Sequence, residues 1–101
     1  MKIRILFSAY DDLKKGRLFY DSQAENLGEY FFDTLFSDID SLHLYGGIHQ
    51  KVFGYHRMLS SRFPFAIYYK LDDNSDVTVW RVLDCRQEPE KTEKQLIDET
   101  S

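Results

Sequence analysis

The sequence has little cysteine, little proline and no long apolar run. Because Cys85 is the one cysteine, no disulfide can form within the chain, which excludes a secreted domain built on a disulfide framework. No apolar run approaches the ~18 residues that a membrane helix needs. The N-terminus turns acidic after a short apolar stretch and has no small-residue cleavage site, so we expect no signal peptide. These absences predict a cytoplasmic protein that does not contact the membrane.

The composition is typical of one folded domain. The chain has 101 residues, of which 43% are hydrophobic and 16% are aromatic. This content argues against disorder, and it places much of the apolar surface in a few large side chains. A chain of this length can bury enough apolar surface to fold without a metal or a disulfide.

Acidic residues are absent from positions 41–71, although the net charge of the whole chain is −4. The basic side chains and histidines of this stretch are Lys51, Arg57, Arg62, Lys70, His43, His49 and His56. The negative net charge does not favour attraction of the whole molecule to nucleic acid. Two interpretations of the stretch stay open: a chance segregation of surface charge, or a localised site for phosphate or another anion.

The first part of the chain predicts a strand and a helix. Over residues 2–7, Ile3, Ile5 and Phe7 alternate with Lys2, Arg4 and Leu6, which is the period of a strand. Ser8 then looks like a helix N-cap, with Asp11 in capping-box position and Asp12 beside it, near the positive end of the helix dipole. We expect this helix to run to about Ala24, and we interpret the two acids as caps.

A second helix is expected to follow after a very short connection. Asn26 and Glu29 repeat the capping pattern, and Gly46-Gly47 marks the end. Apolar residues recur at helical spacing: Leu27, Phe31, Leu35, Ile39 and Leu42. The short link predicts an antiparallel helical hairpin.

Beyond this hairpin the apolar period changes to two. Residues 51–60, 63–71 and 77–85 each predict a strand, and the polar stretch 72–76 predicts a turn between the last two. Neighbouring strands should pair antiparallel, with the last strand in a central position because it is apolar on both faces.

The element order β-α-α-β-β-β predicts an α+β fold, an antiparallel sheet with a helical hairpin packed on one face. We expect a single domain over residues 1–90. The charged tail, residues 91–101, is interpreted either as frayed or as a short helix over about 94–99.

Three stretches resemble the RelE/ParE superfamily, the plasmid-stabilisation-type toxins of bacterial type II toxin–antitoxin systems. They are SAYDDLKKGRLFYDSQAENLGEYFFDTL, YHRMLSSRFPFAIYYKL and VTVWRVLDCRQEP, and the likeness covers about residues 3–90. The resemblance implies a toxin that inhibits growth and is neutralised by a cognate antitoxin protein. Its target would be DNA gyrase, as in the ParE branch, or the ribosome and its mRNA, as in the RelE branch.

The resemblance also implies site residues. Arg57 matches the arginine of the family's "yR" strand, and Arg86 matches the arginine at the end of the last strand. Lys51 is loosely comparable to the basic residues before the first of these strands, and Arg62 could contact phosphate. We expect Arg57 and Arg86 to converge on an exposed face of the sheet.

RNA cleavage by attack of the 2′-hydroxyl also needs groups that transfer protons. The family uses a late tyrosine or histidine, and neither follows Arg86 in this sequence. His49 and His56 are the candidate substitutes, although His56 should point toward the helices if Arg57 points outward, because adjacent strand residues face opposite sides. The histidine spacing matches no metal-ligand pattern, so no metal or cofactor is expected.

Three functions therefore stay open. The gyrase-poisoning ParE-like toxin is slightly favoured. The alternatives are a ribosome-dependent mRNA endonuclease of RelE type and a non-toxic binding or regulatory relative.

Overall fold

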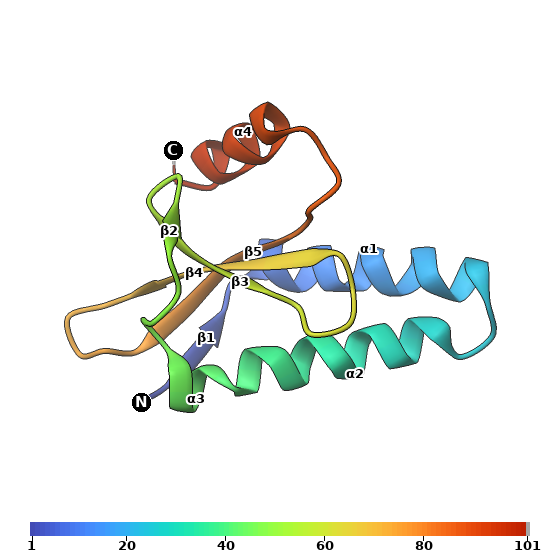
Figure 1. The fold of residues 1–101 in the computed structure, drawn as a ribbon, viewed down its shortest axis with the longest axis horizontal. Helices are drawn as coiled ribbons and strands as arrows, with labels where there is room; N and C mark the ends of the chain where they lie inside the picture. Colours follow the sequence, from blue (N-terminus) through green and yellow to red (C-terminus); the bar gives the residue numbers. More distant parts are fainter. Residues whose placement is uncertain (101) are drawn as a thin grey trace.

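The computed structural model describes the backbone of residues 1–100 and the side chains of residues 1–97. It is a five-stranded sheet with a helical hairpin on one face and a C-terminal helix on the other (Figure 1). The elements, in chain order, are β1 (Ile3–Ile5), α1 (Phe7–Gln23), α2 (Leu27–Asp40), α3 (Leu42–Tyr45), β2 (Lys51–Val52), β3 (Tyr55–Leu59), β4 (Phe65–Leu71), β5 (Val77–Asp84) and α4 (Pro89–Thr100).

The strand order is β1-β5-β4-β3-β2. The expected α+β class, the antiparallel pairs β3–β4 and β4–β5, and the interior position of β5 are confirmed. The sheet is mixed rather than wholly antiparallel, because β1 pairs parallel with β5, with Ile3 opposite Val77 and Ile5 opposite Val79. The helical hairpin lies between β1 and the later strands in the chain, and such a crossover is what parallel pairing requires.

The stretch 51–60, expected as one strand, is two strands. Phe53 and Gly54 have φ angles of 55° and 84°, and they form the two-residue turn that folds β2 back on β3. Positive φ at both central residues is the requirement of a tight type I′ hairpin turn. The expectation was wrong because Phe-Gly is not one of the usual turn pairs, and the alternation of side chains continues through both strands.

The helical hairpin depends on two close approaches at glycine. A Cβ added at Gly16 would lie 2.5 Å from the ring of Phe31, and one added at Gly28 would lie 2.3 Å from the carbonyl oxygen of Arg17. Because these sites have no side chain, α1 and α2 can pack tightly above the sheet. The core on this face comes from both helices, α3 and the sheet: Ala9, Leu13, Phe31, Leu35, Ile39, Leu42, Met58, Phe65, Ile67, Tyr69, Val77, Val79 and Val82.

The helix starts differ from the predicted caps. Helix α1 begins at Phe7, one residue before the expected cap, and its N-cap, Leu6, makes no side-chain capping bond. The Ser8 hydroxyl donates instead to the backbone carbonyl of Trp80, at 3.3 Å. Asn26 is the N-cap of α2, as expected, but its φ of 66° is left-handed and its side chain makes no cap bond. The role of Asn26 is therefore to adopt the left-handed backbone conformation at the reversal between the two helices, and not to cap α2 with its side chain.

A β-bulge lets β5 serve both faces of the sheet. The register shifts between Tyr68 and Tyr69, whose partners on β5 are Arg81 and Val79. As a result Val79 and Val82, three residues apart, both contact the helical-hairpin core. Trp80 packs with the apolar cluster of the opposite face. This irregularity explains why apolar residues crowd the last strand in the sequence.

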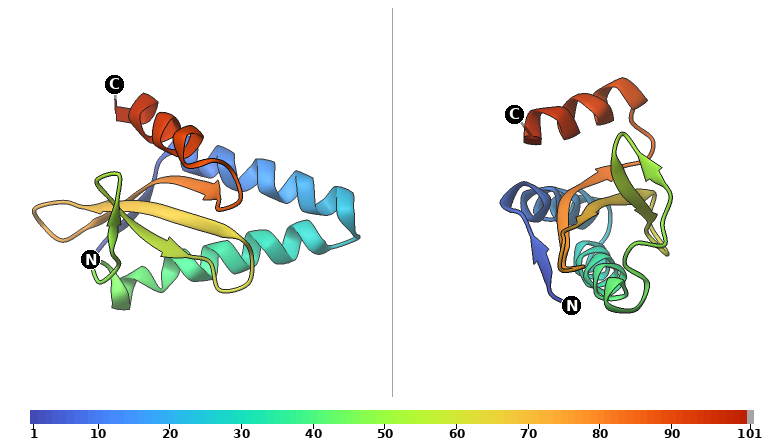
Figure 2. Two further views of the ribbon diagram at one scale, coloured as in Figure 1. Left: turned by 45° about the horizontal axis from the view of Figure 1, so that its top comes forward. Right: turned by 90° about the vertical axis from the view of Figure 1, so that its left-hand side faces the viewer.

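Helix α4 covers the face of the sheet opposite α2 (Figure 2). Its Leu96 is 1% exposed and belongs to a second apolar cluster with Tyr55, Ala66, Tyr68 and Leu83. The tail was expected to be frayed or to form a short helix over about 94–99; in the structure the helix begins at Pro89.

Hydrogen bonds fasten α4 to the sheet. The Tyr55 hydroxyl donates to the carbonyl of Leu96 at 3.3 Å, and Arg81 Nη1 donates to the carbonyl of Gln95 at 3.4 Å. The side-chain amide of Gln87, which follows β5, donates to the Thr92 hydroxyl and to the side-chain oxygen of Gln95, at 2.7 Å each. Because Leu96 is the one buried apolar side chain among the described residues of this charged segment, the sequence pattern gives a weak signal for this packing.

Candidate functional site

Arg57 lies on β3 and points to the α4 side of the sheet. Its Nε donates to the hydroxyl of Tyr68 at 3.1 Å, and its Nη2 lies 3.5 Å from Cys85 Sγ. Tyr68 is its cross-strand partner, so the two side chains share one face. Arg57 and Cys85 line a cavity of about 170 Å³ that Pro89 and Thr92 also border.

Arg86 follows the end of β5 and folds back on Asp84. Its Nε and Nη2 donate to the two oxygens of that carboxylate, at 3.0 and 2.7 Å. These hydrogen bonds from Arg86 lower the pKa of Asp84, which stays ionised and offsets the arginine's charge. Arg86 borders a different cavity, of about 250 Å³, together with Lys15 and Phe19 of α1.

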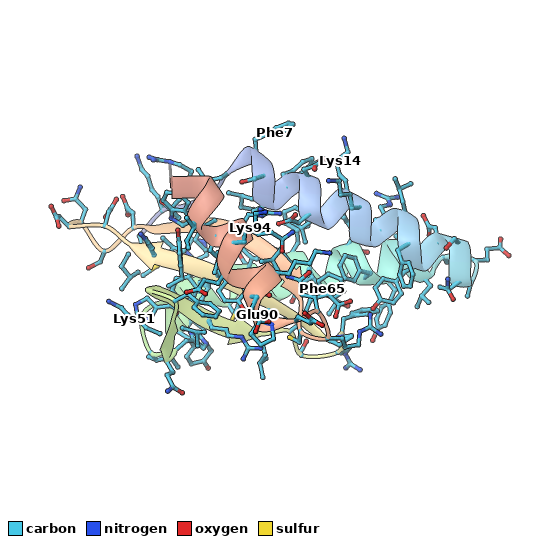
Figure 3. All side chains as sticks on the ribbon, turned by 90° about the horizontal axis from the view of Figure 1, so that it is seen from above. Phe7, Lys14, Lys51, Phe65, Glu90 and Lys94 are labelled. Atoms are coloured by element: carbon cyan, nitrogen blue, oxygen red, sulfur yellow. The ribbon has the colours of Figure 1, made fainter. Side chains whose placement is uncertain are left out.

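The two arginines therefore approach Cys85 but enter different cavities. Burial raises the pKa of the Cys85 thiol, and the charges of Arg57 and Arg86 only partly offset that effect. The expectation of a convergent pair on an open face is corrected in two respects: the two side chains enter different cavities, and the face is covered. Helix α4 lies across this face of the sheet (Figure 3), and Arg57 is partly buried next to it.

The two candidate histidines lie on the other side of β3. The His56 ring stacks on Tyr69 with the centroids 5.0 Å apart, and its Nδ1 donates to the carbonyl of His49 at 2.6 Å. The Tyr69 hydroxyl accepts a hydrogen bond from the Gly47 amide at 2.9 Å and is bonded to His49 Nδ1. The structure therefore does not bring either histidine to Arg57, and His56 points to the helical-hairpin side, as the alternation of strand residues predicted.

The environment of His49 and Tyr69 favours the neutral form of each group. Burial, and then the nearby His56, lower the pKa of His49. Burial also raises the pKa of Tyr69, against the hydrogen bonds that it accepts. Nδ1 of a neutral His49 can accept a hydrogen bond from the Tyr69 hydroxyl. The cluster therefore has a structural explanation, because it connects the loop before β2 to the core.

The two predicted phosphate contacts lie at separate places. Lys51 is exposed on the edge strand β2, directly opposite His56. Arg62 is exposed in the turn between β3 and β4. That turn is held to α2 by Asp38, whose carboxylate accepts hydrogen bonds from the hydroxyls of Ser60 and Ser61, at 2.7 and 2.8 Å.

Sequence reasoning missed a buried ion pair. Asp12 is 9% exposed; its carboxylate accepts from Arg81 Nε and Nη2, at 2.7 and 2.8 Å, and from the amide of Val82 at 3.0 Å. The interpretation of Asp12 as a cap was therefore wrong. An arginine within an otherwise apolar strand was the signal that could have indicated a buried partner, because buried charges are paired.

Among the described residues, no group of three or more His, Cys, Asp or Glu side chains is arranged to hold a metal ion. None of the helices that the structure describes combines the length and the apolar character of a membrane span.

Comparison with known proteins identifies the fold. No protein-family model matches the sequence, and a search of curated proteins gives no match. Among solved structures, a chain of the "Chromosomal ParDE TA system from P. aeruginosa" superposes with a TM-score of 0.72. The alignment covers 81% of this chain and 92% of that chain at 14% sequence identity. The RelE/ParE-like fold that the resemblance predicted is confirmed.

Proposed function

We propose that this protein is the toxin component of a type II toxin–antitoxin system and is neutralised by a cognate antitoxin protein. The observation that carries the proposal is the fold shared with the chromosomal ParDE system over 81% of the chain. The three stretches that resemble the RelE/ParE superfamily support it from the sequence.

For the mode of action we favour the ParE-like poisoning of DNA gyrase. Three features argue against cleavage of RNA. His49 and His56 lie on the side of β3 away from Arg57. The carboxylate of Asp84 offsets the charge of Arg86. Neither a tyrosine nor a histidine follows Arg86 in the sequence to transfer protons.

A ribosome-dependent mRNA endonuclease of RelE type is the second candidate function. The observation that favours it is that Arg57 and Arg86, which match the family's basic positions, both lie near Cys85. Two guanidinium groups can stabilise a phosphorane-like transition state without a metal. A non-toxic binding or regulatory relative is the third, and it would keep the fold without either activity.

Induced expression separates these functions. A toxin arrests growth, and co-expression of the antitoxin from the adjacent gene restores it; unaffected growth would contradict both toxin functions. DNA breaks with an SOS-type response, together with inhibition of purified gyrase, are the expected results of the favoured function. Cleaved transcripts on ribosomes would instead indicate the nuclease.

Substitution of the arginines sharpens the test. Under the nuclease hypothesis Arg86→Ala abolishes toxicity, whereas the matched substitution Arg4→Ala, at an exposed residue of the edge strand β1, leaves it intact. Circular dichroism and the thermal midpoint verify that both variants fold. A fully toxic Arg86→Ala protein would exclude the nuclease function and leave the gyrase function standing.

A further inference from the structure

The two helices of the hairpin carry opposite charges on the side that faces away from the sheet. Helix α1 has Lys14 and Arg17 there, both exposed, and Figure 3 shows Lys14 pointing away from the sheet. Helix α2 has no lysine or arginine, and its exposed stripe carries Glu29 and Asp33. Residues three or four apart share one side of a helix, so each pair forms a stripe along its own helix.

None of these four side chains forms an ion pair with the described part of the chain. The three carboxylates of α1 are engaged elsewhere: Asp11 binds Lys15 at 3.0 Å, Asp12 binds Arg81 at 2.7 Å, and Asp21 accepts the backbone N–H of Gly28 at 2.8 Å. The outer stripe of α1 is therefore basic, that of α2 is acidic, and the described residues neutralise neither of them.

An aromatic seam lies between the two stripes. Tyr10 of α1 is 43% exposed and packs edge-on against Phe32 and Phe36 of α2, with ring centroids 6.2 and 6.4 Å away. The guanidinium carbon of Arg17 lies 5.1 Å from the centroid of the Phe32 ring, so the basic stripe borders the seam directly. Aromatic and arginine side chains are enriched in protein–protein interfaces. The outer face of the hairpin therefore has an apolar centre with one cationic and one anionic flank.

The charges of this face indicate which partner fits it and in which orientation. Because the face is basic along one helix and acidic along the other, a second copy of the same face is complementary to it. With the helices aligned, a two-fold axis can run along them or across them. An axis along the helices places α1 of each copy over α2 of the other, so that basic stripes meet acidic ones. An axis across the helices places like stripes together, which is unfavourable.

We propose that the outer face of the hairpin binds a second copy of this chain and forms a two-fold dimer whose axis runs along the helices. Because α1 and α2 are antiparallel and Gly16 lies beside Phe31, Lys14 is level with Asp33 within one copy. An axis along the helices preserves this level, so Lys14 lies opposite the partner's Asp33. The other basic residue of the stripe, one turn along α1, lies opposite the partner's Glu29, and the two aromatic seams meet at the axis.

The size of the face predicts a weak dimer. Two helices, each ~10 Å wide, cover about 500 Å² per copy over the ~25 Å length of the 17-residue α1. The total of about 1,000 Å² lies at the lower limit of specific interfaces. We therefore expect a dissociation constant in the micromolar range.

The dimer does not depend on the proposed function. Neither Arg57 nor Arg86 lies on α1 or α2. A protein that arrests growth but stays monomeric would overturn the dimer alone, and a dimer that leaves growth unaffected would overturn the proposed function alone.

Sedimentation velocity of the full chain, from low to high micromolar concentration at low ionic strength, tests for the dimer. The wild type should shift from the monomer toward the dimer as the concentration rises. Asp33→Lys should weaken association by about 10-fold or more, because the symmetry repeats each lost pair. Asp73→Lys is the matched control, since Asp73 is exposed in the turn between β4 and β5, and it should associate like the wild type. A monomer at every concentration, or equal losses in the two variants, would overturn the proposal.

An exchange of charges tests the pairing itself. Lys14→Glu alone should weaken the dimer as Asp33→Lys does. The two substitutions in one chain should restore most of the affinity, because each pair forms again with its signs reversed. Circular dichroism verifies that all three variants fold. A double variant that associates no better than either single one would overturn the pairing of Lys14 with the partner's Asp33.

Cysteine cross-linking tests the direction of the axis. Two cysteines form a disulfide only where their backbones lie close together. In the Cys85→Ser background, a mixture of the Lys14→Cys and Asp33→Cys proteins should form a disulfide-linked dimer under mild oxidation, and neither protein should do so alone. A cross-link within either protein alone, or none in the mixture, would overturn the arrangement with the axis along the helices.

Discussion

The two faces of the sheet are built differently. The helical-hairpin face has thirteen buried residues in one cluster, supplied by α1, α2, α3 and the sheet. Among the described side chains, the cluster on the α4 face has five buried residues, of which Leu96 is the one that α4 supplies. The α4 face also carries the charged and polar groups Arg57, Tyr68 and Lys70. The comparison shows that the helical-hairpin face supplies most of the buried core. The α4 face buries fewer residues and therefore has room for charged side chains such as Arg57 and Lys70.

The largest expected effect comes from truncating the hairpin face. Phe31 is fully buried and packs against Tyr20, Phe63 and Phe65, with centroids about 5 Å apart. Phe31→Ala should lower the free energy of unfolding by about 3–5 kcal/mol, since a large cavity opens at the centre of the core. For a domain of this size, such a loss is a large fraction of the total stability. Urea denaturation followed by circular dichroism measures it.

Leu96→Ala is the matched change on the other face. It should cost about 2 kcal/mol, at the lower end for a buried leucine, because α4 can separate while the hairpin core remains. Limited proteolysis should then cut α4 after Lys91 or Lys94 in the variant well before the rest of the chain. A global loss as large as that of Phe31→Ala, with no early cleavage in α4, would show that the two faces unfold as one unit.

The fold was largely readable from the sequence, and the exceptions have physical reasons. The stripe through Phe31, Leu35 and Ile39 repeats at helical spacing, so periodicity located the core of α2. Periodicity could not locate the Phe53-Gly54 turn, because a tight hairpin continues the same alternation in both of its strands. It located α4 poorly, leaving a frayed tail and a short helix both open, because Leu96 is the one buried apolar side chain among the described residues of that helix.

The candidate site was less predictable than the fold. Strand alternation separated Arg57 from His56 correctly, since it depends only on local geometry. The sequence could not indicate that Arg81 reaches Asp12, because this pair depends on the bulge and on the position of α1. Interactions set by tertiary placement have no signature at a fixed spacing.

The ion pair that joins the two faces should give an effect between those of Phe31→Ala and Leu96→Ala. Arg81 bonds Asp12 of α1 on one side and the carbonyl of Gln95 in α4 on the other. Asp12→Asn removes the carboxylate charge that faces a largely buried arginine and should cost about 3 kcal/mol by chemical denaturation. Asp11→Asn is the control: Asp11 makes an exposed pair with Lys15 and should cost less than about 0.5 kcal/mol. Similar losses in the two variants would show that the Asp12–Arg81 pair does not fasten the faces together.

The smallest effect concerns the loop that joins α3 to β2, and it depends on pH. Burial and the proximity of His56 lower the pKa of His49 from its usual 6.5, so the unfolded chain binds a proton more readily than the folded one. Linkage then requires the free energy of unfolding to fall as the pH drops through about 6.5, and to level off below the folded pKa. Between about pH 7.5 and about pH 5, the His49→Gln variant should lose less stability than the wild type. Thermal denaturation at each pH measures the difference. His43→Gln, at an exposed residue of α3, should keep the wild-type profile. An unchanged pH profile in His49→Gln would mean that protonation of the Tyr69 cluster does not loosen the hairpin-side loop, so that the pH sensitivity belongs to another part of the molecule.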